Sequence, residues 1–257
     1  MAINVNTVYQ TVLSILNKEQ RGYMTPDEFN KVGTQVQLEI FEKYFEDLNQ
    51  QARVPQSDLN YSNRLENIDE KIAIFKTFGN AVYNNTSVTP DNYFTLPNID
   101  SYGQTVNLYR IGEVTYKNEV LIQRLQRNDF YTSEKSKLTK ATETFPTYLY
   151  ENNYLFVRPK TIQNNVQVEY VRKPLDVIWG FNVGTLGQYN WNESEYNVAT
   201  NVNGSINFEL HESEQTEVIL RILQYAGIII RDPQIVQAAA QQVQMDEINK
   251  KSFSCFC

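Results

Sequence analysis

Cysteine is almost missing from this sequence of 257 residues, because the two that occur, Cys255 and Cys257, both lie at its C-terminal end. Two thiolates cannot fill the four ligand positions of a structural zinc site, and no further cysteine is present to cross-link a fold. A structural zinc site and a disulfide framework are therefore excluded. Residues 252–257 are interpreted either as an inert tail or as an apolar end that docks on a partner.

Positive charge and long apolar runs are also scarce. The net charge of −7 argues against a dedicated duplex-DNA-binding protein, whose affinity comes largely from Lys and Arg on phosphates. The apolar run Ala226–Ile230 is far too short to span a bilayer. Residues 1–6 lack the basic start and apolar block of a secretory signal, so we expect synthesis in the cytoplasm and no membrane contact.

Recognisable catalytic chemistry is lacking as well. The sequence has one histidine, His211, and contains no Gly-rich phosphate loop, nucleophile-elbow serine or His-Glu-x-x-His motif. His211 stands where a predicted strand gives way to a helix, which favours a structural role. Acidic pairs such as Glu212 and Glu214 are explained by capping at helix starts. We therefore expect no enzymatic activity, no cofactor and no metal.

The segment Phe145–Trp179 has the pattern of an antiparallel sheet. Residues 147–158 are rich in Tyr, Leu, Phe and Val on either side of Asn152-Asn153, which tolerates the positive φ of a two-residue hairpin turn. The run Val166–Tyr170 alternates apolar and polar residues and predicts a third strand with one buried face.

Helical periodicity dominates both ends of the chain. The second helix begins at a capping box with proline in its first position, Thr25-Pro26-Asp27-Glu28, and Asn6 is the expected N-cap of the first. The predicted helices cover residues 7–19, 26–48, 63–75, 218–230 and 233–251. The remaining predicted strands cover residues 93–96, 106–116, 119–125 and 206–210, and residues 129–141 form a short helix or a loop.

These patterns predict an α+β fold. Residues 1–80 and 206–251 would form one helical bundle, and residues 81–205 an antiparallel β subdomain. Residues 246–257 would form a tail.

The longest stretch without periodicity, residues 180–205, is predicted to be a long loop within the β subdomain. Loops of this length inside a compact fold tend to be functional or disordered. We favour a partner-binding loop over a plain surface excursion, with Tyr189, Trp191 and Tyr196 as candidate contacts.

Four basic residues, Arg158, Lys160, Arg172 and Lys173, cluster around the ends of the predicted central strands. One interpretation is solvated edge charge that discourages aggregation. The other is a subunit interface, in which this basic patch meets acidic helices of an identical neighbour in a ring.

Several phrases of the sequence, taken in order, resemble a known family. They are Asn92–Pro97, Phe145–Tyr148, Tyr154–Pro159, Val168–Pro174 and the block from Glu209–Glu212 to Asp232-Pro233. They resemble the head–tail adaptor (connector, or ring) proteins of short-tailed phages. The segment from Ile15–Tyr23 to Phe29-Asn30 is similar to that of ring proteins in crAss-like phages.

The resemblance implies a non-enzymatic virion protein at the head–tail junction. It would form a homo-oligomeric ring, commonly a dodecamer, below the portal protein and above the next tail or ring protein. DNA would pass through the channel during ejection without specific binding. In similar adaptors the C-terminal segment docks on the portal, and the candidate docking residues here are Met245, Ile248, Lys250, Lys251, Phe253 and Phe256.

Two other functions stay open at this point. A receptor- or glycan-binding tail protein would use Tyr189, Trp191 and Tyr196 as stacking groups. A tail-associated hydrolase would need a pair of carboxylates in a cleft.

Overall fold

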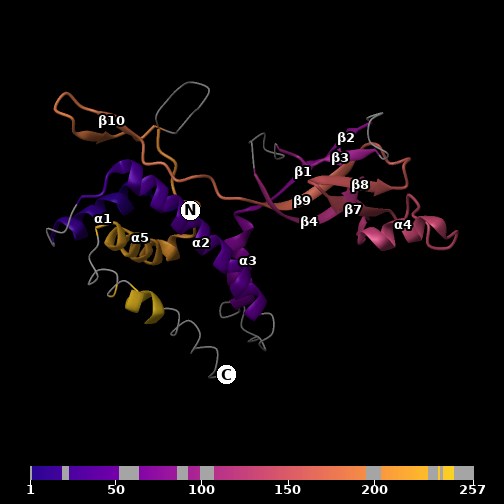
Figure 1. Ribbon diagram of the computed structural model, residues 1–257, viewed down its shortest axis with the longest axis horizontal. Coiled ribbons are helices and arrows are strands. Elements are labelled where there is room, and N and C mark those ends of the chain that lie inside the picture. The colour runs from indigo at the N-terminus through magenta and orange to yellow at the C-terminus, as the bar shows by residue number, and fades with distance from the viewer. Residues whose placement is uncertain are drawn as a thin grey trace. The chain divides into compact units, whose positions relative to one another are not determined.

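The fold is α+β, as predicted, and its elements gather in two compact units (Figure 1). The computed structural model describes residues 2–18, 23–51, 64–85, 92–98, 107–194, 204–230, 237 and 240–245. Unit 1 combines Met1–Ile74 with Pro174–Cys257, and unit 2 is Phe75–Lys173. Two segments fall outside the division expected from the sequence. Residues 75–80 contain a strand of unit 2, and residues 174–194 belong with the helices of unit 1.

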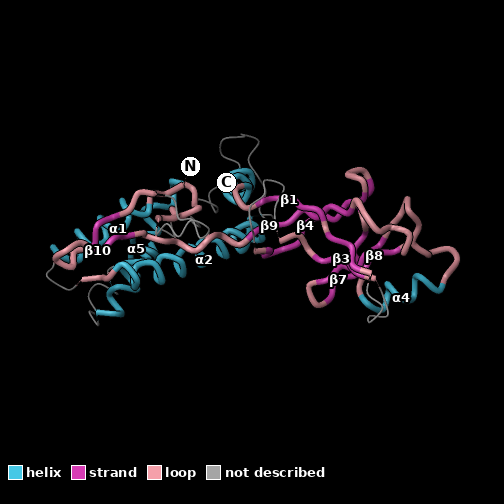
Figure 2. The backbone as a smooth tube through the Cα atoms, turned by 90° about the horizontal axis from the view of Figure 1, so that it is seen from above, coloured by secondary structure: helices cyan, strands magenta, loops and turns pink. Residues whose placement is uncertain are grey.

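Unit 1 is built on helices that pack against one another, and those labelled in Figure 2 run alongside one another. The helices are α1 (Val5–Lys18), α2 (Pro26–Gln51), α3 (Arg64–Ala73) and α5 (Gln215–Ile230), the last preceded by the 3-10 turn η2 (Glu212–Glu214). α2 packs against α3 and α5, and α1 packs against α5. The apolar stripes predicted for α1, α2 and α5 form the core, which includes Val8, Val12, Leu16, Phe29, Val36, Ile40, Phe41, Val218 and Ile222.

The starts of the first two helices are fixed by side-chain caps. The capping box of α2 is confirmed, because the Thr25 N–H donates to Glu28 Oε2 at 2.9 Å and the Glu28 N–H donates to Thr25 Oγ1 at 3.4 Å. The expected N-cap of α1 is wrong. Asn4, not Asn6, accepts the N–H groups of Asn6 and Thr7 at 2.9 and 3.1 Å, which leaves the Asn6 side chain for another partner.

Replacing Thr25 by Ala is expected to lower the free energy of unfolding of unit 1 by about 1 kcal/mol, because it removes this cap. Hydrogen bonds from Thr25 lower the pKa of Glu28. The contribution of that carboxylate is therefore present above its unfolded pKa and is lost as pH falls through the folded one. Urea unfolding near neutral pH and in acid, followed by tryptophan fluorescence, measures both effects.

The matched control is Thr11→Ala, which removes a hydroxyl that, among the described residues, bonds only to the Thr7 carbonyl within α1. We expect it to change stability little, because alanine is the better helix former. A Thr25→Ala penalty of the same size in acid as at neutral pH would contradict the assigned role of Glu28.

The described residues of unit 2 form two sheets and one helix. The four-stranded sheet has the order β1-β9-β4-β5, with β1 (Lys76–Asn80), β4 (Leu108–Tyr116), β5 (Val120–Leu121) and β9 (Val166–Arg172). The five-stranded sheet has the order β2-β3-β8-β7-β6, with β2 (Val82–Asn84), β3 (Tyr93–Thr95), β6 (Gln123–Arg124), β7 (Thr147–Glu151) and β8 (Tyr154–Arg158). Pairing is antiparallel except between β6 and β7.

The strand predictions for this unit are largely confirmed. Asn152 and Asn153 have φ values of 51° and 62° and form the turn between β7 and β8. In β9 the burial alternates as predicted, with the buried side chains of both sheets forming one core that includes Phe94, Val114, Tyr148, Leu155, Val166, Val168 and Tyr170. Residues 119–125 split into β5 and β6, and the segment 129–141, predicted as a short helix or a loop, overlaps helix α4 (Arg127–Lys135).

Two predictions for the second half of unit 1 are wrong. Residues 180–205 are not structureless throughout, because β10 (Phe181–Val183) and β11 (Tyr189–Trp191) form an antiparallel hairpin. Residues 206–210 form no strand, only isolated bridges from Ile206 to Ile178 and from Phe208 to Ile3. Of the last predicted helix, residues 237 and 240–245 are helical, and the rest lies outside the described residues.

Candidate functional site

Side chains of α2 hold an extended segment, residues 175–179, along the helix. Asn30, Thr34 and Gln37 make these contacts, and their spacing of four and then three positions places them on one face of the helix. Residues two positions apart in an extended chain are separated by roughly 6.7 Å along the chain, and one turn of an α-helix advances by about 5.4 Å. The two spacings are close enough for every second residue of the extended segment to meet a successive turn of the helix over a short distance. The hydrogen bonds run from Gln37 Nε2 to Leu175 O (2.7 Å), from Val177 N to Thr34 Oγ1 (3.0 Å) and from Trp179 N to Asn30 Oδ1 (2.7 Å).

Gln37 also joins a second piece of chain to this arrangement. Its Oε1 accepts the N–H of Glu209 at 2.8 Å, so one buried amide side chain satisfies backbone groups of two segments. Phe208 lies next to Glu209 and packs over Gly33, where an added Cβ would meet the phenyl ring at 3.3 Å. The hydrogen bonds and the close approach together fix the backbone that leads to Trp179.

Trp179 forms the floor of a groove of about 570 Å³, which we call the aromatic groove. Its lining consists of Asn6, Tyr9, Gln10, Leu13, Tyr23, Trp179 and residues 187–191. The side chain of Asn6, which does not cap α1, accepts the indole N–H of Trp179 at 3.1 Å. Tyr9 is buried beside Trp179, with ring centroids 4.5 Å apart, and its hydroxyl donates to the Met24 carbonyl at 3.0 Å.

Aromatic contacts continue from the floor into the hairpin. The rings of Trp179 and Phe181 are stacked at 5.9 Å, and Phe181 meets Tyr189 edge to face at 4.9 Å. Burial is the main cause that raises the pKa of Tyr9, and the hydrogen bond with Tyr23 is the second. This phenol therefore stays protonated at neutral pH. The groove is therefore held in shape by interlocked rings and by hydrogen bonds to both floor residues.

Of the three predicted loop contacts, the structure places Tyr189 and Trp191 in the aromatic groove. Tyr196 lies outside the described residues. The sequence prediction missed the floor residues Tyr9 and Trp179, because Tyr9 belongs to the apolar stripe of α1 and Trp179 ends a predicted sheet segment. The one sequence feature that could have indicated these floor residues is the density of aromatic and amide residues around Trp179.

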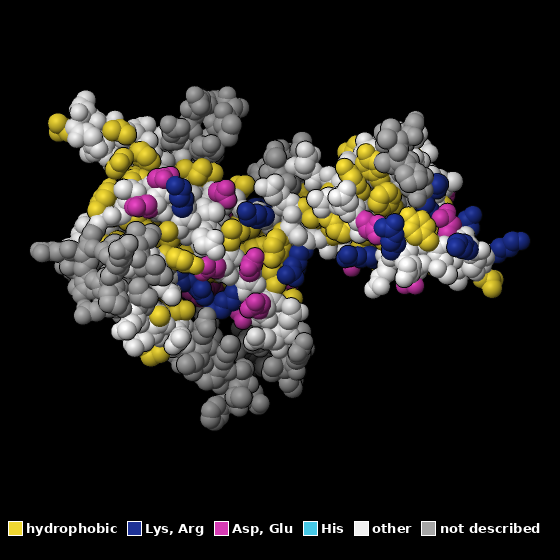
Figure 3. Space-filling view, in the orientation of Figure 1, with side chains coloured by type: hydrophobic (Ala, Val, Ile, Leu, Met, Phe, Trp, Pro, Cys, Tyr) yellow, Lys and Arg dark blue, Asp and Glu magenta, His cyan; other side chains and the backbone are white. Residues whose placement is uncertain are grey.

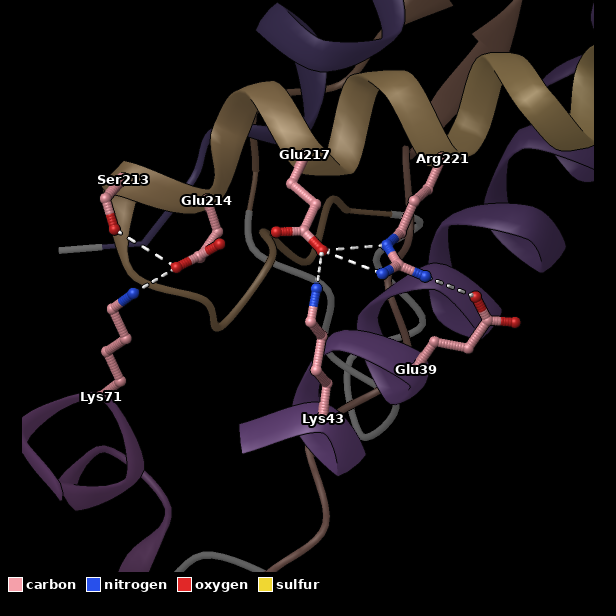
Figure 4. Close-up of polar contacts among 7 residues, drawn as sticks. All are labelled: Glu39, Lys43, Lys71, Ser213, Glu214, Glu217 and Arg221. Carbon is pink, nitrogen blue, oxygen red and sulfur yellow. Dashed lines mark hydrogen bonds and ion pairs between the residues drawn. The ribbon is translucent and has the colours of Figure 1, made fainter. Parts of the chain in front are cut away.

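A second polar feature joins α2 to α5 (Figure 4). Glu217 Oε1 lies 3.1 Å from Lys43 Nζ and accepts from Arg221 Nε and Nη2 at 3.1 and 2.9 Å. Arg221 Nη1 in turn lies 3.5 Å from Glu39 Oε2. These charges are mostly buried and satisfied within unit 1, so they serve to hold α5 against α2.

The single histidine lies beside this cluster at the start of η2. His211 is the N-cap of η2, and its Nδ1 accepts the Ser213 N–H at 3.2 Å and lies 2.9 Å from Ser213 Oγ. Glu214 is buried and pairs with Lys71 of α3 (Figure 4). In a catalytic triad the carboxylate orients the histidine, whereas here Ser213 lies between His211 and Glu214. The contacts are those of a helix cap.

Comparison with models of known protein families and with curated proteins finds no match to this chain. Within the residues that the structure describes, no group of three His, Cys, Asp or Glu side chains is placed to hold a metal ion. No helix in that part of the chain is long and apolar enough to cross a membrane.

The four basic residues predicted at a subunit interface differ in their surroundings. Arg158 is buried, and its Nε donates to Glu134 Oε2 of α4 at 3.1 Å, so its charge is used inside unit 2. Lys160 is exposed after the end of β8. Arg172 and Lys173 are half-buried at the end of β9, and Arg172 lies over the ring of Phe75. Lys160, Arg172 and Lys173 remain as candidates for a surface contact.

Of the six predicted portal-docking residues, the structure describes one. Met245 is in a helical stretch and is exposed. Ile248, Lys250, Lys251, Phe253 and Phe256 lie outside the described residues.

Proposed function

We propose that the protein is a virion structural protein, a head-to-tail adaptor that forms a ring below the portal and continues the DNA channel from capsid to tail. The observation that carries the proposal is the exposure of large apolar side chains in both units. In unit 1, Leu186 at the turn between β10 and β11 is 91% exposed, and Val183 beside it is also exposed. Hydrophobic side chains are visible at the end of this hairpin (Figure 3).

Unit 2 also exposes large apolar side chains, in a segment of different sequence. Leu138 and Phe145, both in the connection from α4 to β7, are 96% and 77% exposed. A head-to-tail ring needs two different complementary patches on each subunit, because the contact is heterologous. Two unlike apolar surfaces on one chain fit that requirement better than they fit an isolated monomer, since exposed apolar patches usually mark interaction sites.

The resemblance to phage adaptor proteins supports the same function. In the proposed ring, identical copies, the portal protein and the next tail or ring protein are the partners. Lys160, Glu42 and Glu46 are exposed, and charged side chains of opposite sign suit the polar edges of such interfaces.

The expected result for the purified chain is a ring, alone or after mixing with portal protein, in negative-stain images and mass photometry. Leu186→Asp should reduce the ring fraction by at least about tenfold, because a buried carboxylate without a partner is costly. Leu186→Met, which keeps an apolar side chain at the same site, should assemble normally. Equal melting temperatures of the variants would show that each subunit is folded.

A truncation tests the portal contact separately. Deleting residues 246–257 should leave a folded subunit that no longer joins heads. A wild-type chain that stays monomeric with and without portal protein would overturn the adaptor proposal, and truncated chains that join heads normally would overturn the assigned docking segment.

A further inference from the structure

The aromatic groove combines two kinds of side chain. Its rings come from elements far apart in the sequence: Tyr9 from α1, Tyr23 ahead of α2, Trp179 from the extended segment, and Tyr189 and Trp191 from β11. The faces of aromatic rings carry negative potential, which attracts the C–H groups of a sugar ring as well as other apolar surfaces. Tyr23 and Tyr189 are exposed, while Tyr9 and Trp179 are buried at the floor.

The second kind of side chain is the carboxamide. Asn6, Gln10, Gln188 and Asn190 line the groove, and the last three are exposed. Each carboxamide offers an acceptor oxygen and a donor NH₂ group. Amides of this kind, on both α1 and the hairpin, present donors and acceptors together at the two sides of the groove.

Charge is missing from the described lining of the groove, since none of the named lining residues is Asp, Glu, Lys or Arg. An ionic ligand would therefore find no partner of opposite charge there. The volume of about 570 Å³ lies within the roughly 300–1,000 Å³ typical of small-molecule sites. The ligand class that fits is neutral, of moderate size, with apolar faces and hydroxyl groups.

We propose that the aromatic groove binds a neutral saccharide. Sugar hydroxyls both donate and accept hydrogen bonds, so they use both ends of the carboxamides. A proline-rich peptide also binds aromatic grooves, but its prolines have no N–H and would use only the donor half of these amides. Among the described lining residues Leu13 is the single aliphatic side chain, which is little for an apolar peptide.

This binding activity goes beyond the adaptor function and does not depend on it. The groove lies wholly within unit 1, and its shape is set by contacts inside the subunit. Failure of ring assembly would leave the saccharide proposal intact, and failure of saccharide binding would leave the adaptor proposal intact.

Intrinsic tryptophan fluorescence can report binding to the groove. It has two tryptophans, Trp179 and Trp191, and both line the groove. The full-length chain is titrated with neutral oligosaccharides (maltohexaose, cellohexaose, mannohexaose and galactohexaose), and with decaproline and oligogalacturonate for comparison. We expect at least one neutral oligosaccharide to change the tryptophan emission saturably, and decaproline and oligogalacturonate to leave it unchanged.

Two variants locate the binding. Tyr189→Ala removes an exposed ring and should weaken binding by about tenfold. Gln10→Ala removes one exposed amide from α1 and should weaken it by about threefold. The matched control is Tyr131→Ala in α4 of unit 2, because Tyr131 is 40% exposed and Tyr189 is 41% exposed. The control should bind like wild type.

Three results would overturn the proposal. The first is an unchanged emission with every neutral oligosaccharide to about 10 mM, a concentration beyond the Kd of even a weak millimolar site. The second is saturable binding of decaproline in preference to the saccharides, which would assign the groove to a peptide. The third is an equal loss of binding in Tyr189→Ala and Tyr131→Ala, with unchanged melting temperatures.

Discussion

Replacing Gln37 by Leu is expected to lower the free energy of unfolding of unit 1 by about 2 kcal/mol. Gln37 is fully buried in α2 and makes two hydrogen bonds, to the carbonyl of Leu175 and from the N–H of Glu209. Leucine has a similar volume but neither donor nor acceptor, so both backbone groups would lose their partner. A net hydrogen bond is worth about 1 kcal/mol, and the cost is greater where water cannot replace it.

Gln35→Leu is the matched control for this experiment. It makes the same chemical change on the same helix, but Gln35 is exposed, and its one hydrogen bond within the described part of the chain is to Glu39, one turn away. Surface changes of this kind usually stay within about 0.5 kcal/mol. Urea unfolding followed by tryptophan fluorescence measures both variants, because the two tryptophans report on unit 1 alone. Equal stabilities of the two variants would contradict the role given to Gln37.

The elements that were predicted from the sequence are those with local signals. The capping box at Thr25, the apolar stripe of α2 and the hairpin at Asn152-Asn153 depend on residues a few positions apart. Burial in β9 followed the alternation of Val166, Val168 and Tyr170 for the same reason. Each signal comes from a structure whose period matches the spacing of the residues that form it.

The elements that were missed depend on partners far along the chain. Residues 175–179 resemble the end of a sheet in sequence, but their neighbour is the polar face of α2, some 140 residues earlier. Asn30, Thr34 and Gln37 look like ordinary polar helix residues until the extended segment is placed beside them. The aromatic groove was missed for the same reason, because residues 175–179 position both Trp179 in its floor and the hairpin that forms its wall.

Arg158 illustrates how burial changes the meaning of a charge. In the sequence it belongs to a basic cluster with Lys160, which suggested a subunit interface. In unit 2 its guanidinium is enclosed, with Glu134 as an ion-pair partner and the ring of Phe130 at 5.1 Å. Composition alone could not separate it from an exposed arginine such as Arg127.

Replacing Glu134 by Ala is therefore expected to destabilise unit 2 by about 3 kcal/mol, because it removes a carboxylate that lies 3.1 Å from the buried guanidinium of Arg158. Arg127 and Glu151 form the matched control, since this pair also joins α4 to the sheet at 3.1 Å and its carboxylate is about as exposed as that of Glu134, but the Arg127 side chain is 68% exposed whereas that of Arg158 is 5% exposed. Glu151→Ala should cost less than about 1 kcal/mol. Hydrogen exchange of the β7 and β8 amides in urea measures both, because unit 2 contains no tryptophan.

The double variant Glu134→Leu/Arg158→Met separates the ion pair from the packing around it. The double variant removes both charges of this pair and retains apolar volume, so most of the stability lost in Glu134→Ala should return. If Glu134→Ala and Glu151→Ala cost the same, burial does not determine the strength of these pairs. If the double variant is as unstable as Glu134→Ala, the penalty comes from lost packing between α4 and β8 and not from the loss of the Glu134 carboxylate.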